Sequence, residues 1–191
     1  MPGGVLSGKK QHPARFVFKG LSMSAKTFVA LRVDCDAQTA FDVFTNDIDL
    51  WWKQGPRNRL IGNRPGVMQF GERDNGTRFL QEVDKRRPDF VVEAGKVIHW
   101  DPAKRLAFEW RWPTADRKEP VTHVDIRFAQ SGDATRLTLT HSGLEALSAA
   151  HPARNGLNDN RFKPMMTHYW QAHLVSLRNR IKQLSAHEGP A

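Results

Sequence analysis

One histidine stands out among the side chains that could take part in chemistry. His141 ends a run of alternating residues, so it shares the apolar face of that segment with Leu137 and Leu139. A histidine on an apolar interior face can hydrogen-bond a ligand or transfer a proton. It can equally hydrogen-bond a backbone carbonyl and close the domain, because a buried polar group needs a partner whatever its function. The pattern favours the structural role and leaves the first alternative open.

The remaining candidates point away from metal and cofactor sites. His168 and His173 are five residues apart, whereas side chains three or four residues apart meet at one metal ion on a helix. The chain has no Gly-rich phosphate loop and no HExxH, CxxC or Gly-x-Ser-x-Gly motif. Cys35 is the single cysteine, so no intrachain disulfide can form. We therefore predict no metal, no cofactor and a cytoplasmic location.

Several other polar residues are predicted to have ordinary roles. Asp47 and Asp49 precede or follow short apolar segments, which is typical of helix caps and surface positions. His99, Glu109 and Arg111 alternate with apolar residues and are predicted to face solvent.

The net charge is +9 at pH 7, and residues 1–26 supply five positive charges and no negative one. A basic tail on a nearly balanced body is a weak signal for nucleic acid, and we interpret residues 1–26 as a flexible, solvated extension. Met23 is an alternative start of translation. The aromatic residues that could stack on bases occupy alternating positions, which favours a buried sheet face; they are Trp110, Trp112 and Phe128. No segment has the roughly 18–20 apolar residues of a membrane-spanning helix.

The periodicity of the chain predicts an α+β fold. Residues 164–184 place an apolar residue every three or four positions, as in an amphipathic helix, with Pro164 in its first turn. Asp36 caps a short helix through Phe44, and a second short helix leads to Trp51 and Trp52. Because adjacent residues cannot share a helix face, one of these tryptophans should lie near a rim. The predicted strands are 28–35, 67–72, 77–83, 90–100, 105–112, 121–128 and 136–141, and 186–191 form a tail.

Alternation within the last two strands predicts their register. Val124, Ile126 and Phe128 share a face with Leu137, Leu139 and His141 only if paired residue numbers have an odd sum, since side chains alternate with period two. A two-residue turn within Ser131–Asp133 gives such a sum.

The chain resembles the SRPBCC (START/birch-pollen-allergen-like) superfamily, and within it the branch of homologues of the heat-shock-protein-90 ATPase activator. The resemblance spans roughly residues 28–184. It is carried by the segments AFDVFT (40–45), WW (51–52), GKV (95–97), WDP (100–102), RL (105–106), FEW (108–110) and TRLTLTHSGL (135–144), with Trp170, Leu174 and Leu177. It implies a helix-grip domain over residues 27–185, in which a curved antiparallel sheet wraps around a long C-terminal helix. It also implies a pocket for an apolar or amphipathic small molecule, but no shared catalytic motif.

The predicted function is therefore non-covalent binding of a small hydrophobic or aromatic ligand between sheet and helix. Apolar walls supply affinity and His141 supplies a polar anchor. The predicted lining is Trp52, Phe70, Trp110, Trp112, Ile126, Leu139, His141, Met166 and Trp170. Two alternatives stay open: an enzyme of the polyketide cyclase, dehydratase or hydrolase kind in the same pocket, and a co-chaperone-like interaction module. An exposed sheet edge or the Arg-rich loop 54–65 offers a surface for a homodimer.

Overall fold

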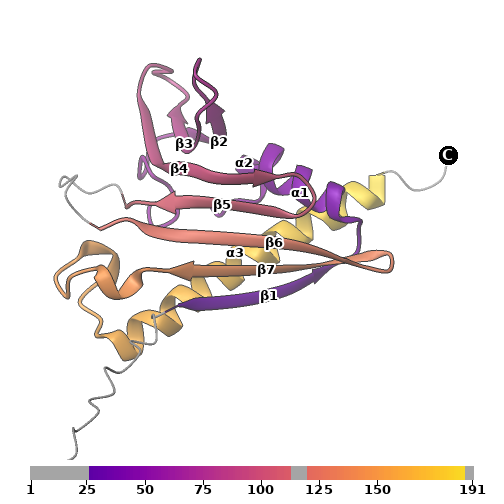
Figure 1. Ribbon diagram of the computed structural model, residues 1–191. Helices are drawn as coiled ribbons and strands as arrows, with labels where there is room; N and C mark the ends of the chain where they lie inside the picture. Colours follow the sequence, from indigo (N-terminus) through magenta and orange to yellow (C-terminus); the bar gives the residue numbers. More distant parts are fainter. Residues whose placement is uncertain (1–25, 113–119, 188–191) are drawn as a thin grey trace, which may run out of the picture.

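The computed structural model describes residues 26–112 and 120–187. The predicted N-terminal extension up to residue 25, the loop residues 113–119 and the end of the predicted tail, 188–191, lie outside the described residues. The elements follow in the order predicted (Figure 1). They are β1 (Thr27–Val33), α1 (Ala37–Asn46), α2 (Ile48–Trp51), β2 (Gly66–Glu72), β3 (Arg78–Asp84), β4 (Val91–Asp101), β5 (Arg105–Trp110), β6 (Thr122–Ser131), β7 (Ala134–Ser142), the short 3₁₀ helices Leu144–Ala146 and Pro152–Arg154, and α3 (Asp159–His187).

The described strands form one antiparallel sheet in the order β1-β7-β6-β5-β4-β3-β2. Two features curve it. The strand register shifts between Leu80 and Gln81 and again between Val97 and His99, and such bulges bend a strand. At Gly95, a Cβ atom would lie 2.0 Å from the carbonyl oxygen of Glu109, so only glycine allows the approach. Figure 1 shows the result: β2, β3 and the start of β4 bend away from the other strands.

The register of the β6–β7 hairpin confirms the prediction. Val124 pairs with His141 and Ile126 with Leu139, and the turn between Ser131 and Ala134 has two residues. One face of both strands is therefore buried, while His123, Arg127 and Arg136 are exposed on the other. Both strands are longer than predicted at the turn, because backbone pairing continues through polar residues that alternation of hydrophobicity does not mark.

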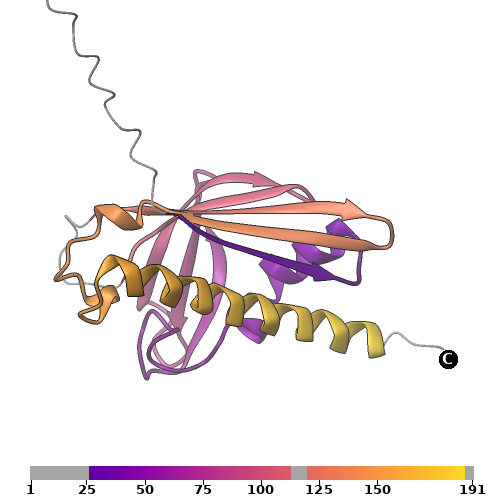
Figure 2. The same cartoon turned by 90° about the horizontal axis from the view of Figure 1, so that it is seen from below.

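Helix α3 lies against the inner face of the sheet (Figure 2). Its predicted apolar stripe is buried from Met166 through Ile181, and Leu184 is partly buried. The predicted start at Pro164 was wrong. The helix begins at Asp159, so Pro164 lies inside it, and the extra turn buries Phe162. The backbone N–H groups of Arg161 and Phe162 bond to the carbonyl of Asn158, which lets the helix begin before the proline.

Helices α1 and α2 lie on the same side of the sheet as α3, and Figures 1 and 2 agree on this placement. Asp36 caps α1 as predicted, accepting a hydrogen bond from Thr39 N at 2.8 Å. The prediction that Trp51 or Trp52 lies near a rim was wrong, since both are 1% exposed. The reason is that α2 ends at Trp51: the backbone of Trp52 is extended, so its ring is free of the helical spacing. The α+β helix-grip fold is confirmed.

Candidate functional site

The nine predicted ligand-lining residues lie on the inner face of the sheet, on α3, and at the end of α2. Seven of them are buried, while Phe70 and Trp112 are half-buried. Most belong to one apolar core shared by sheet and helices. The structure therefore brings the predicted residues together, in contact with one another.

Five of their rings, together with the ring of His173, form a continuous set that we call the aromatic cluster: Trp52, Trp110, Trp112, His141, Trp170 and His173. Trp52 stacks on Trp110, with centroids 5.8 Å apart and ring planes 25° apart. Trp170 packs edge-on against both, at 5.8 and 5.7 Å. Phe70 lies further out and reaches the cluster through Phe108, which is 6.4 Å from Trp110. Strand β5, strand β7, helix α3 and the residue after α2 each contribute to this arrangement.

His141 is held by hydrogen bonds at both ring nitrogens. Trp170 Nε1 donates to His141 Nδ1 at 3.0 Å. Because an indole nitrogen can only donate, Nδ1 must be the acceptor, and the proton of the neutral ring lies on Nε2. His141 Nε2 then donates to Thr122 Oγ1 at 2.8 Å, and that hydroxyl donates to the carbonyl of Trp110 at 3.0 Å. This directed chain links β5, β6, β7 and α3.

Burial keeps His141 uncharged. Burial, with a smaller contribution from the nearby His123, lowers the pKa of His141 to about 3. His173 behaves similarly, because burial lowers its pKa to about 4. Both rings of the cluster are therefore neutral at physiological pH, which suits hydrogen bonding better than the delivery of a proton.

His173 was not among the predicted site residues, and it carries the most unusual feature of the cluster. Its ring lies 4.5 Å from Trp52 and its Nδ1 donates to the carbonyl of Tyr169 at 2.8 Å. The neutral ring then presents a lone pair at Nε2, a buried atom with no hydrogen-bond partner among the described residues. A signal for it existed in the sequence: a histidine within the apolar stripe of the last helix.

Trp110 presents the complementary group. Its Nε1 is a buried donor that also finds no partner within the part of the chain that the structure describes. Trp110 is 3% exposed and His173 is 1% exposed, and both rings contact Trp52. Nearly all buried polar atoms in proteins are hydrogen-bonded. An unpaired donor on Trp110 and an unpaired acceptor on His173, both next to Trp52, therefore distinguish this part of the core as a candidate site.

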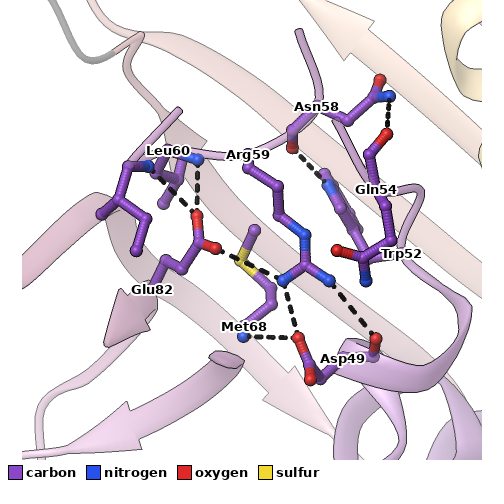
Figure 3. A network of polar contacts seen from close by, with 9 residues as sticks. Asp49, Trp52, Gln54, Asn58, Arg59, Leu60, Met68 and Glu82 are labelled. Atoms are coloured by element: carbon purple, nitrogen blue, oxygen red, sulfur yellow. Dashed lines mark hydrogen bonds and ion pairs between the residues drawn. The ribbon is translucent and has the colours of Figure 1, made fainter. Parts of the chain in front are cut away.

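The loop between α2 and β2 holds Trp52 in place (Figure 3). Trp52 Nε1 donates to the carbonyl of Asn58 at 2.7 Å, and the Asn58 side chain donates to the carbonyl of Gln54 at 2.9 Å. The next residue, Arg59, anchors the loop to the body. This loop was predicted, but its link to the aromatic cluster was not.

Arg59 lies between two carboxylates that Figure 3 shows converging on it. Its Nη1 lies 2.6 Å from Asp49 Oδ1 and 3.4 Å from Glu82 Oε1. Glu82 is 0% exposed and accepts from the N–H groups of Leu60 and Ile61 at 2.6 and 3.2 Å. The prediction of a surface role for Asp49 was therefore wrong, since it accepts from both Arg59 and Met68 N. Asp47 occupies the N-cap position of α2, as predicted, but its side chain makes no capping hydrogen bond and instead pairs with Arg180 at 2.8 Å.

Other candidate chemistry receives no support from the geometry. His168 is exposed while His173 is buried, so the two do not face one site. Among the described residues, no three metal-type side chains converge. Arg111 is exposed as predicted, whereas His99 and Glu109 are half-buried. A separate cavity of about 260 Å³ lies at the β1–β7 side of the sheet, lined by Ala30, Leu31, Arg32, Ser131, Ala134, Thr135 and Arg136, and includes none of the predicted residues. No described helix is long and apolar enough to span a membrane.

Comparison with solved structures supports the fold. TTHA0849 from Thermus thermophilus is 14% identical, with a TM-score of 0.56, over 84% of this chain and 99% of that one. CV1439 from Chromobacterium violaceum is 14% identical, with a TM-score of 0.52, over 82% and 96%. DynU16, a protein of the dynemicin biosynthetic locus, is 13% identical, with a TM-score of 0.52, over 83% of this chain and 47% of its own. At these identities the likeness shows the fold alone.

Sequence comparison identifies the family. A search of the curated proteins found no match. The sequence model of the family described as activator of Hsp90 ATPase homolog 1-like protein matches residues 34–182, which is most of the chain and includes every element from α1 to the greater part of α3. This confirms the branch that the resemblance indicated. The chain belongs to the activator of Hsp90 ATPase homolog 1-like family.

Proposed function

We propose that the protein binds a small hydrophobic or aromatic molecule that carries a hydroxyl group, within the aromatic cluster between the sheet and α3. The observation that carries this proposal is the pair of buried, unpartnered atoms, Trp110 Nε1 and His173 Nε2. Leaving a buried polar atom unpaired costs roughly 1–3 kcal/mol, so two such atoms beside one ring are an expensive arrangement for a purely structural core.

A hydroxyl matches both atoms because its oxygen can accept from an indole N–H and its hydrogen can be donated to an imidazole nitrogen. The surrounding rings supply an apolar, aromatic wall, the usual composition of a small-molecule site with few polar groups. The nine predicted lining residues remain the proposed wall. His141 contributes to it through its fixed ring, since both of its nitrogens are already engaged.

Ligand entry requires the cluster to open, and loop 54–65 is the element suited to that. It covers Trp52 and is attached through the Asn58 carbonyl and the Arg59 ion pairs. A connecting loop can move without breaking the sheet, whereas the walls on β5, β7 and α3 are parts of regular elements.

A pair of matched probes tests the proposal. Binding of naphthalene and of 2-naphthol, followed by tryptophan fluorescence, isolates the contribution of one hydroxyl. We expect 2-naphthol to bind about tenfold more tightly, since one well-made hydrogen bond to an otherwise unpaired group is worth on the order of 1–2 kcal/mol. Trp110→Phe removes the orphan donor and should reduce this preference to about twofold or less.

A second variant tests the location without depending on the hydroxyl. Leu139→Trp adds volume to the proposed wall and should abolish uptake of both probes, with a cooperative thermal transition showing that the variant is folded. Uptake that is unchanged in folded Leu139→Trp, or a naphthol preference that Trp110→Phe leaves intact, would contradict the proposal.

A further inference from the structure

The end of loop 54–65 and the turn between β3 and β4 form one basic surface. Lys85 N donates to the carbonyl of Pro65 at 2.8 Å, which joins the two segments. Four exposed cations lie on them, and we call this surface the basic corner: Arg64, Lys85, Arg86 and Arg87, with Phe90. None of its residues belongs to the aromatic cluster or to the proposed lining of the ligand site.

The basic corner is held in a fixed shape. Asp84 is buried, and its carboxylate accepts from the N–H groups of Arg86 and Arg87 at 2.8 and 3.2 Å, which fixes the turn. The guanidinium carbons of Arg64 and Arg87 lie 4.8 and 5.0 Å from the centroid of the Phe90 ring. Two arginines from separate segments are thereby positioned on one aromatic side chain.

Two arginines of the neighbouring β2–β3 hairpin show what Arg64 and Arg87 lack. Arg73 lies 4.1 Å from the Phe79 centroid and pairs with Glu93 at 2.5 Å. Arg78 lies 4.6 Å from the Trp100 centroid and pairs with Glu72 at 2.7 Å. Arg64 and Arg87 make the same kind of ring contact, yet within residues 26–112 and 120–187 neither has a carboxylate at ion-pair distance. The described residues therefore supply no anion for either guanidinium group.

Exposed apolar side chains adjoin these arginines. Phe90 is 36% exposed and Val91, the first residue of β4, is 41% exposed. Cations beside exposed apolar side chains at a loop tip fit the boundary of a membrane, where phosphate groups lie above hydrocarbon. We propose that the basic corner docks the protein onto anionic lipid headgroups, with Arg64 and Arg87 binding phosphate and Phe90 and Val91 entering the interface.

Nucleic acid fits this surface less well. Single-strand binding uses an extended basic groove and aromatic faces open to bases, whereas the cations here are confined to two adjoining segments and the Phe90 ring already carries two guanidinium groups.

Vesicle co-sedimentation of the full chain tests the proposal. The probes are vesicles of pure phosphatidylcholine and vesicles in which about one third of the lipid is phosphatidylserine, at low and high salt. The test variant is Arg64→Gln/Arg87→Gln and its matched control is Arg73→Gln/Arg78→Gln, which removes the same two charges from carboxylate-paired arginines. Arg64→Lys/Arg87→Lys retains the charge.

We expect binding to the anionic vesicles only, weakening with salt. Arg64 and Arg87 each contribute about fivefold to the affinity, so the test variant should bind about 25-fold more weakly. The control should stay within about twofold of the unchanged protein, and the lysine variant should keep most of the affinity. Equal losses in the test and control variants would overturn the proposal, because general charge would then explain binding. So would the absence of vesicle binding in a chain that binds a single-stranded oligonucleotide through the same arginines.

Discussion

Trp110 and Trp170 are buried neighbours that differ in one hydrogen bond, which allows a matched test of the site. Their ring centroids are 5.7 Å apart. Trp170 Nε1 donates to His141 at 3.0 Å, whereas Trp110 Nε1 has no partner among the described residues. Replacing either tryptophan by phenylalanine removes one N–H group and a similar ring volume.

The two substitutions should change the stability by different amounts because only Trp170→Phe leaves buried a polar atom that has lost its partner. Trp170→Phe loses roughly 1–2 kcal/mol of packing and leaves His141 Nδ1 buried without its donor, which adds roughly 1–3 kcal/mol. Trp110→Phe loses similar packing but removes an unpaired donor, whose burial had itself cost roughly 1–3 kcal/mol. The free energy of unfolding should therefore fall by about 2–5 kcal/mol in Trp170→Phe, whereas in Trp110→Phe it should lie between a loss of about 1 kcal/mol and a gain of about 2 kcal/mol.

Urea unfolding at pH 7.5 measures both values. Trp51→Phe is a suitable control, since Trp51 Nε1 donates to the carbonyls of Val43 and Phe44 at 3.1 and 3.2 Å and its loss should cost about as much as that of Trp170. If Trp110→Phe proves as costly as the other two, the Trp110 N–H group has a partner in the free protein and the reasoning behind the ligand site is refuted.

Two further predictions concern stability. Burial lowers the pKa of His141 to about 3 and of His173 to about 4, so between pH 6.5 and pH 4 the unfolded chain binds more protons than the folded one. The free energy of unfolding should be highest above pH 6.5 and should fall by roughly 3–5 kcal/mol by pH 4.5. Urea unfolding at pH 6.5 and pH 4.5 measures this difference, and an equal free energy at the two pH values would contradict the prediction. Arg59→Met should cost about 3–5 kcal/mol because it leaves the buried Glu82 without its cationic partner, and adding Glu82→Gln should restore part of the loss. The same unfolding assay decides this, and a cost below about 1 kcal/mol for Arg59→Met alone would show that the ion pair does not anchor the loop.

Features set by local periodicity could be predicted from the sequence. The pairing of Val124 with His141 follows from alternation and a two-residue turn, both of which depend on neighbouring residues only. The inward position of Trp170 follows in the same way from the helical period of α3. Since each of these residues lies on the inner face of its own element, their meeting in one cluster was a consequence of the fold class.

Features set by contacts between distant parts of the chain could not be predicted from the sequence. The position of Trp52 depends on where α2 ends, which the sequence of a four-residue helix does not mark. The ion pairs of Arg59 join a loop, a helix and a strand, and no periodicity links such distant positions. One local signal was available: Glu82 shares the inward face of β3 with Leu80, which places a carboxylate in the core and requires a partner for it.

The unpaired atoms of Trp110 and His173 illustrate a further limit. Their burial follows from the pattern, but whether a buried atom is paired depends on the positions of all its neighbours. His141 and His173 both lie on apolar faces, yet the first is fully hydrogen-bonded and the second is not. Only the three-dimensional arrangement separates the structural histidine from the candidate ligand-binding one.

Native mass spectrometry of the freshly purified protein, beside its denatured mass, tests the central claim most directly. If the aromatic cluster holds a small hydroxylated hydrophobic molecule, the native mass exceeds the denatured mass by a discrete adduct, and Leu139→Trp lacks that adduct. Protein loaded with 2-naphthol provides the positive control. A native mass equal to that of the bare chain, with no adduct after incubation with 2-naphthol, would contradict the account and favour the enzyme or interaction-module alternatives.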